Sequence, residues 1–304
     1  MQKESIQHNA DIVLRSSDGV TFHCWRALLS ISSSIFSDMF SLPQPDTSYN
    51  ADELPIVDLV EDGRTLHLIV SLCHPPSFTG KLFEPDSIRE LEAVLEAAKK
   101  YEMEDLRSAA LLKLSDPYLV RQDPLRMYGL ACLYQCRDAA KLAAQHTLVL
   151  PTLMRPGYVP DWALDRLTWY RDACAKAACA LADDHRWIGY IRFSDLFGHG
   201  RARTTVSWIK CPLHSSGFET VNAYGWWMEY MKKSGQALRE SPRGNTVKNK
   251  GLVDDVFAAI LSSEWKSKVS RIWMTFQSFV DVFAEKIDSQ VAEVCSVSRF
   301  RRIN

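Results

Sequence analysis

The sequence predicts an α+β protein, with a small three-stranded sheet and about five helices within residues 10–116 and an all-helical region after them. The first indication is a hairpin pattern close to the N-terminus, followed by an abrupt change to helical spacing. The second is that strand signals nearly vanish after residue 116. The third is the length of 304 residues, which favours two domains over one.

The hairpin is predicted from residues 12–24. Residues 12–14 form a short apolar run rich in β-branched side chains, as in a buried strand. Asp18-Gly19 favours a tight turn, because both residue types tolerate a positive φ. Beyond the turn, Val20, Phe22 and Cys24 alternate with polar residues, which is the period of a half-buried strand.

Helical spacing begins at Trp25, and residues 25–40 are expected to form two helices broken by serines. A third strand is expected at 54–59. Asp62 is a candidate N-cap of the next helix, and Ser87-x-x-Glu90 is a candidate capping box. The last helix of this unit is expected at 103–114.

The remaining residues are predicted to be mainly helical. Asp123-Pro124 is typical of a helix start, and Asp161 is a candidate cap of a long helix. Residues 186–221 are expected to be irregular, followed by helices at 222–240, 252–264 and 267–295. The predicted organisation is a short arm at 1–9, a domain at 10–116, a helical region at 117–185 and a mainly helical region at 186–304.

The composition is ordinary for a soluble globular protein, and we expect the chain in the cytoplasm, the nucleus or both. No apolar run reaches the ~20 residues that cross a bilayer, and the N-terminus lacks a secretory pattern. The eight irregularly spaced cysteines are interpreted as reduced thiols. Residues 1–116 carry 19 acidic and 10 basic side chains, whereas the rest carries 18 and 26. This asymmetry indicates either units with different partners or two differently solvated surfaces.

The first unit resembles the BTB/POZ domain over its whole length. The resemblance rests on Asp11-Ile12, the Asp18-Gly19 turn, Phe22, Arg26 and the segment SIFSDMF at 34–40. Further on, IVDL, LHLIVSLCHP and LEAVLEAAKKYEMEDLRSAALLKL stand where the family has its third strand and last three helices. The stretch that follows is similar to the helical tails of a BTB subgroup of mushroom-forming fungi.

The resemblance implies a non-enzymatic protein-interaction module that self-associates, recruits a cullin-type ubiquitin ligase scaffold or binds corepressors. Asp11 and Arg26 match the charged pair that lines the central pocket of dimeric members. A partly buried pair suits that role, since an unpaired charge there costs on the order of 3–5 kcal/mol. The alternative is a local ion pair that joins the hairpin to the first helix.

Three features depart from the family pattern. Trp25 stands where the family usually has histidine. Only ten residues precede Asp11, so a possible homodimer is not expected to be of the strand-swapped type. Leu42-Pro43-Gln44 stands near the place of a hydrophobic-x-Glu motif of cullin-binding members but lacks the carboxylate. Cullin recruitment is therefore a possible adaptor function and not the first expectation.

No catalytic motif and no cofactor site are predicted. Cys211-x-x-His214 is a weak zinc half-site, because a structural zinc needs four ligands and only His199, His185 and Cys179 are further candidates. Cys132, Cys136 and Cys174 are interpreted as core residues. The sequence therefore predicts neither an enzyme nor a metalloprotein.

Nucleic-acid binding is the competing function from another class. Residues 232–250 contain a basic cluster and a single acidic residue, Glu240. The cluster could neutralise phosphates. The cluster comprises Lys232, Lys233, Arg239, Arg243, Lys248 and Lys250, and Arg299, Arg301 and Arg302 add charge at the C-terminus. Trp226, Trp227 and Tyr230 could stack on bases, but their helical spacing favours core positions. A solvated basic face is the favoured interpretation.

Overall fold

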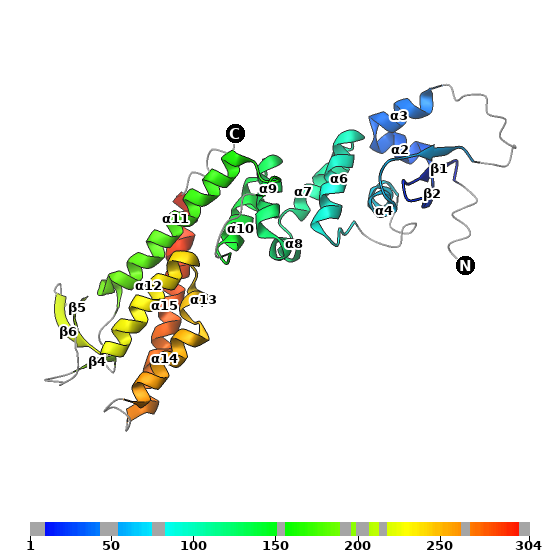
Figure 1. The fold of residues 1–304 in the computed structure, drawn as a ribbon. Helices are drawn as coiled ribbons and strands as arrows, with labels where there is room; N and C mark the ends of the chain where they lie inside the picture. The colour runs from blue at the N-terminus through cyan, green and yellow to red at the C-terminus, as the bar shows by residue number, and fades with distance from the viewer. Residues whose placement is uncertain are drawn as a thin grey trace. The chain divides into compact units, whose positions relative to one another are not determined.

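In the computed structural model, the chain forms two compact units, Met1–Ala143 and Ala144–Asn304. The structure describes residues 10–42, 54–74, 83–150, 156–188, 196–198, 207–212, 218–262 and 268–297, with only the backbone described at 197–223. Each unit is considered by itself below (Figure 1).

The N-terminal unit is organised around a three-stranded sheet in the order β2-β1-β3. Strand β1 (Ile12–Arg15) pairs antiparallel with β2 (Thr21–Cys24) and parallel with β3 (Ile56–Asp58). Gly19 completes the hairpin turn with φ of 83°, a conformation that costs glycine little. The apolar run 12–14 is buried because β1 is the central strand. The predicted α+β class and the three-stranded sheet are confirmed.

Among the described residues up to 116, five helices accompany this sheet, and Ser33, Asp62 and Ser87 cap three of them. They are α2 (Arg26–Ser32), α3 (Ser34–Ser41), α4 (Gly63–Cys73), α6 (Ile88–Lys100) and α7 (Glu104–Lys113). Asp62 accepts a hydrogen bond from the N–H of Thr65, as a cap of α4. Their inward faces supply the core residues Leu29, Phe36, Leu66, Ile69, Leu91, Val94 and Leu106.

The capping box at the start of α6 is displaced by one residue. Ser87 Oγ accepts from the N–H of Glu90 at 3.2 Å, as expected. The carboxylate of Glu90 accepts from the N–H of Asp86 at 2.8 Å, one position before the residue that the motif predicts. Arg64 accounts for part of this shift, because its guanidinium lies 3.2 Å from the Glu90 carboxylate and 2.6 Å from that of Asp86.

The compact N-terminal unit continues past the expected boundary at residue 116. Asp116 caps α8 (Pro117–Gln122), a helix that the sequence does not predict, and Asp123 caps α9 (Pro124–Leu133). The guanidinium of Arg126 on α9 makes a two-pronged pair with Glu92 on α6, with Nε 2.7 Å from Oε1. This half-buried pair joins α9 to the domain that precedes it.

Helices dominate the C-terminal unit. Helix α11 (Asp161–Asp183) lies beside α12 (Gly225–Glu240) and α15 (Val269–Val297), as Figure 1 shows. Helix α10 (Arg137–Thr147) crosses into this unit, and a 3-10 turn, η1 (His185–Trp187), follows α11. The shorter helices are α13 (Gly244–Val247) and α14 (Lys250–Leu261). Asp161 stands in the first turn of α11 and not at its cap, because Pro160 occupies the cap position.

Aromatic residues form the core of this unit. The Tyr230 and Phe276 rings meet edge to face with centroids 4.9 Å apart, and Trp187 stacks on Phe283 at 5.3 Å. Trp227 is fully buried against Phe279. The predicted core positions of Trp227 and Tyr230 are confirmed, and neither ring is accessible to a nucleic-acid base, whereas Trp226 is only half-buried.

A second sheet lies in the segment that the sequence predicts to be irregular. Strands β4 (Phe197–Gly198), β5 (Ser207–Pro212) and β6 (Phe218–Ala223) pair antiparallel in the order β4-β6-β5. The irregular interpretation of 186–221 is therefore wrong for these residues, and α12 begins at Gly225, later than expected. Short strands among glycines give a weak periodic signal, whereas the pairing of β5 with β6 is a property of the folded backbone.

In the described residues, no helix combines the length and the apolar character that a membrane span requires.

Gly63, at the start of α4, offers a test of the packing between the hairpin and the helix. A Cβ atom there would lie 2.7 Å from Val20 Cγ2 and 3.2 Å from the Asp18 carboxylate, which accepts the Gly63 N–H at 2.8 Å. We expect Gly63→Ala to lower the free energy of unfolding by about 1–3 kcal/mol through overpacking. Urea titration followed by circular dichroism measures this change. Gly157→Ala is the control, since nothing lies within 4 Å of its Cβ position; equal effects of the two substitutions would contradict the packing argument.

Candidate functional site

Asp11 and Arg26 lie at the start of β1 and of α2. The Asp11 carboxylate accepts a hydrogen bond from the backbone N–H of Arg26, with Oδ1 to N of 2.7 Å. Trp25, the cap residue of α2, makes no side-chain cap bond, so Asp11 performs that task from the neighbouring strand. The Arg26 guanidinium carbon lies over the Phe40 ring, 5.9 Å from its centroid. The hairpin is thus joined to the first helix through a carboxylate–backbone bond, where the sequence suggests an ion pair.

Trp25 packs on a buried histidine at the end of α4. The Trp25 and His74 rings stack with centroids 5.5 Å apart. His74 Nδ1 lies 3.1 Å from the carbonyl of Val70, and Nε2 lies 3.5 Å from the N–H of Trp25. Both contacts are satisfied when Nδ1 carries the proton and Nε2 accepts. Burial lowers the pKa of His74, which favours this neutral form.

Apolar side chains of α2 and α3 reach the surface beside these residues. Ile31 on α2 is 83% exposed, and Leu42, just after α3, is 64% exposed. Ile35 and Met39 are half-buried and share a face of α3 by their i, i+4 spacing. Pro43 and Gln44, the other residues of the predicted cullin-type motif, lie outside the described residues. We call the surface formed by Ile31, Ile35, Met39 and Leu42 the α2–α3 face.

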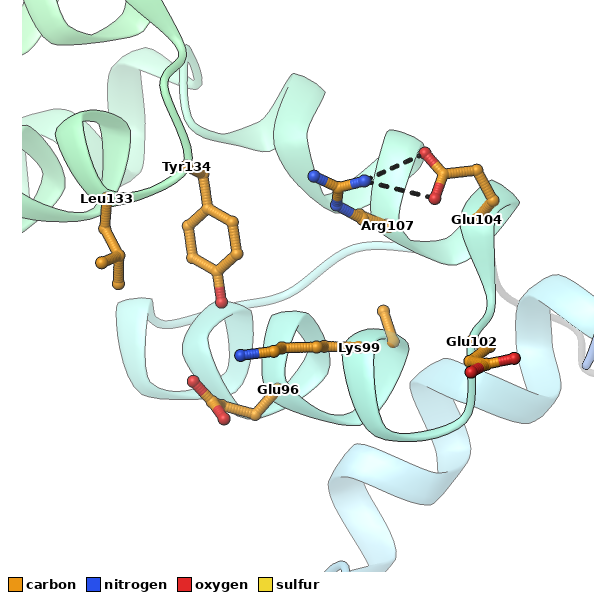
Figure 2. Close-up of a pocket in the computed structure, with 8 residues that line it drawn as sticks. Glu96, Lys99, Glu102, Glu104, Arg107, Leu133 and Tyr134 are labelled. Atoms are coloured by element: carbon orange, nitrogen blue, oxygen red, sulfur yellow. Dashed lines mark hydrogen bonds and ion pairs between the residues drawn. The ribbon is translucent and has the colours of Figure 1, made fainter. Parts of the chain in front are cut away.

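A cleft of about 470 Å³ lies elsewhere in the same unit, between the end of α6, the start of α7 and the end of α9 (Figure 2). Two helix ends with the same backbone geometry border it. Glu102 after α6 and Gln135 after α9 have φ of 51° and 58°. The next N–H in each case bonds to a carbonyl five residues earlier, Met103 to Ala98 and Cys136 to Ala131.

The lining of this cleft is charged and contains an aromatic ring. The side chains are Glu96, Lys99, Glu102, Glu104, Arg107, Leu133 and Tyr134, with Ala98. Figure 2 shows the Tyr134 ring extending from the end of α9 toward Glu96 and Lys99 on α6. Arg107 and Glu104 pair across one side at 3.3 Å. Burial, and then the negative charge of Glu96, raise the pKa of Tyr134. The sequence gives no signal that these residues line one cleft, because they come from three different helix ends.

The comparison with protein families decides the identity of the N-terminal region. The family model described as the BTB/POZ domain matches residues 2–116. This chain carries a BTB/POZ domain. No curated protein matches the chain. The BTB/POZ domain is a protein-interaction module, and the matched residues include the three-stranded sheet and helices α2–α7.

The basic cluster that follows the BTB/POZ domain in sequence is partly neutralised by the fold. Lys233 Nζ lies 2.8 Å from Asp255 on α14, and Lys248 Nζ lies 2.7 Å from Asp281 on α15. The sequence shows only Glu240 as an acid within this stretch, because Asp255 and Asp281 approach the lysines only when the helices pack. Lys232 and Lys250 are exposed, and Arg243 is half-buried. These two ion pairs lower the positive charge that the cluster offers to phosphates.

The predicted zinc half-site gains no further ligand among the described residues. Cys211 lies on β5, whereas His214 and His199 fall outside the described residues. His185 packs edge to face on Trp227, with its Nε2 3.0 Å from the carbonyl of Ala182. Within the described ranges, no group of three His, Cys, Asp or Glu side chains has metal-binding geometry. Cys132 and Cys174 are buried core residues, as predicted, and Cys136 is half-buried.

Replacement of His74 tests the Trp25 contact through pH. Because folding lowers the pKa of His74 below its ordinary value of 6.5, the contribution of the neutral ring is fully present above that pH. It is lost as the pH falls through the lower folded-state pKa. We expect the free energy of unfolding to fall less between neutral pH and about pH 5 in His74→Gln than in the natural chain. Urea titrations at a series of pH values measure this difference, and parallel curves for the two chains would contradict it.

Proposed function

We propose that the chain acts by self-association, with the α2–α3 face of the BTB/POZ domain as the contact between two copies. The observation that carries this proposal is Ile31, a large apolar side chain that is 83% exposed. Burial of an isoleucine side chain contributes about 1.5–3 kcal/mol, so its exposure in a single copy is a cost that a partner surface removes. In a contact with two-fold symmetry, Ile31 of each copy is buried, so this free energy is gained twice.

The residues around Ile31 favour a rigid contact. The Asp11 bond holds the first turn of α2 against β1, and Ser33 caps α3 by accepting the N–H of Phe36 at 3.1 Å. Ser33 Oγ also donates to the carbonyl of Tyr101 on α6. The two helices that carry the apolar side chains are therefore fixed to the domain core before any partner arrives, which lowers the entropic cost of binding.

Arg26 supports a contact in the same place. Its Nε is buried, and no acceptor for it is found in the described part of the chain. An unsatisfied buried donor on a cation is costly, and a guanidinium that turns outward to an acceptor of a second copy removes that cost. The exposed Asp11 carboxylate lies at the start of the same helix and is one candidate acceptor.

Substitution of Ile31 tests the proposal. We expect Ile31→Asp to weaken self-association at least about tenfold, because it replaces a buried apolar contact with a charge. Light-scattering mass across a concentration series measures the shift. The matched control is Leu112→Asp on α7, a similar side chain that is 79% exposed and outside the face.

Three outcomes are separated by this pair of variants. A loss of mass with Ile31→Asp alone supports the α2–α3 face. Equal losses with both variants point to general destabilisation and contradict the proposed face. A natural chain that is monomeric at every concentration contradicts self-association altogether, and would favour recruitment of a different protein by the domain.

A further inference from the structure

Helix α11 in the C-terminal unit presents two exposed tryptophans on one face. Trp162 and Trp169 are 48% and 47% exposed, and their i, i+7 spacing places them about 10 Å apart along the helix axis. Asp165 and Arg166 lie between them on the same face, by i+3 and i+4 spacing. We call Trp162, Asp165, Arg166 and Trp169 the α11 strip.

Other side chains of α11 form its buried side. Leu164, Leu167 and Tyr170 form the opposite side of α11 and are buried. The aromatic residues of the core, Trp227 among them, are almost completely enclosed. Tryptophan and arginine on an accessible helix face are the residue types that dominate protein contacts, since each combines a large apolar area with a directional polar group.

The strip has a two-fold pattern in its own sequence. The segment reads WALDRLTW, and from its midpoint between Asp165 and Arg166 the leucines and tryptophans match in both directions, the central charges are opposite, and Ala163 stands opposite Thr168. If a second α11 packs antiparallel about an axis through that midpoint, Trp162 of each copy faces Trp169 of the other. Asp165 of each copy then faces Arg166 of the other. The surface is complementary to itself in both apolar and charged contacts, as an isologous interface requires.

We propose that the α11 strip is a second self-association surface, whose partner is the α11 strip of another copy of this chain. The Arg166 guanidinium already lies on this face, 5.3 Å from the centroid of the Trp162 ring. That contact holds the positive charge beside the aromatic surface, where it meets an opposing carboxylate and an opposing indole. The proposal concerns the other unit of the chain and does not depend on the α2–α3 face.

This contact is small and therefore weak alone. Four side chains per copy cover less than the roughly 800 Å² per partner of a standard interface, so the expected dissociation constant is micromolar or weaker. Its effect increases when another contact already holds two copies together, because the second contact then forms at high effective concentration. Two separate two-fold contacts on one chain would also join copies into assemblies larger than a dimer.

Charge exchange tests the antiparallel pairing in the full chain. Asp165→Arg makes the central charges of both copies positive, and Arg166→Asp makes them negative. Each single variant should lose association at least roughly tenfold, because like charges face each other. An equimolar mixture of the two variants should regain it, since opposite charges then meet at both positions. The measurement is light-scattering mass at concentrations up to roughly 100 μM. Every variant also carries Ile31→Asp, so that the α2–α3 face does not contribute to the measured association.

Each result decides the proposal. Restoration in the mixture, and in the double variant that carries both exchanges, supports the α11 pairing and excludes a folding defect as the cause of the single-variant loss. Unchanged mass in the single variants overturns it. A loss that the mixture does not restore also overturns it and would indicate a different partner for the tryptophans. Failure of Ile31→Asp to lower the mass concerns the BTB/POZ face alone, because the mixture is compared with each single variant in that background.

Discussion

Strand β1 is the element on which the N-terminal unit depends. Its apolar residues are buried because it is hydrogen-bonded on both sides, to β2 and to β3. The Asp11 carboxylate, at the start of β1, accepts a hydrogen bond from the first N–H of α2. The Asp18 carboxylate, in the turn after β1, accepts one from the first N–H of α4. Two helices are therefore positioned by carboxylates at the two ends of one strand, and the α2–α3 face is placed by the same arrangement.

Charged side chains position several elements of this protein. The Arg126–Glu92 pair joins the helices after residue 116 to the BTB/POZ domain, and Arg171 donates to carbonyls at the end of α10 and to that of Glu240. Lys233 and Lys248 meet aspartates from neighbouring helices. These pairs reduce the positive charge that the basic part of the sequence offers to phosphates.

The two proposed contact surfaces belong to different units of the chain. The α2–α3 face is apolar and belongs to a domain whose family is defined by protein contacts. The α11 strip is aromatic, charged and symmetric about its own midpoint. Both lie on helices whose opposite sides are anchored in a core, so a partner meets side chains that are already ordered. The cleft beside Tyr134 differs from both, because its charged residues from α6 and α7 surround a single ring from α9.

The sequence by itself determined the elements that local chemistry controls. The buried strand at 12–14, the cap at Asp62, the helix start at Asp123-Pro124 and the core placement of Trp227 follow from neighbours within a few residues. Tertiary structure alone decided which groups meet across distant segments. It paired Asp11 with a backbone N–H, brought Asp255 and Asp281 to lysines, and joined β5 to β6 in a segment without clear periodicity. The near-symmetric order of residues in WALDRLTW can be seen in the sequence. Only packing shows that its tryptophans are partly exposed, because burial depends on which side of the helix the rest of the unit covers.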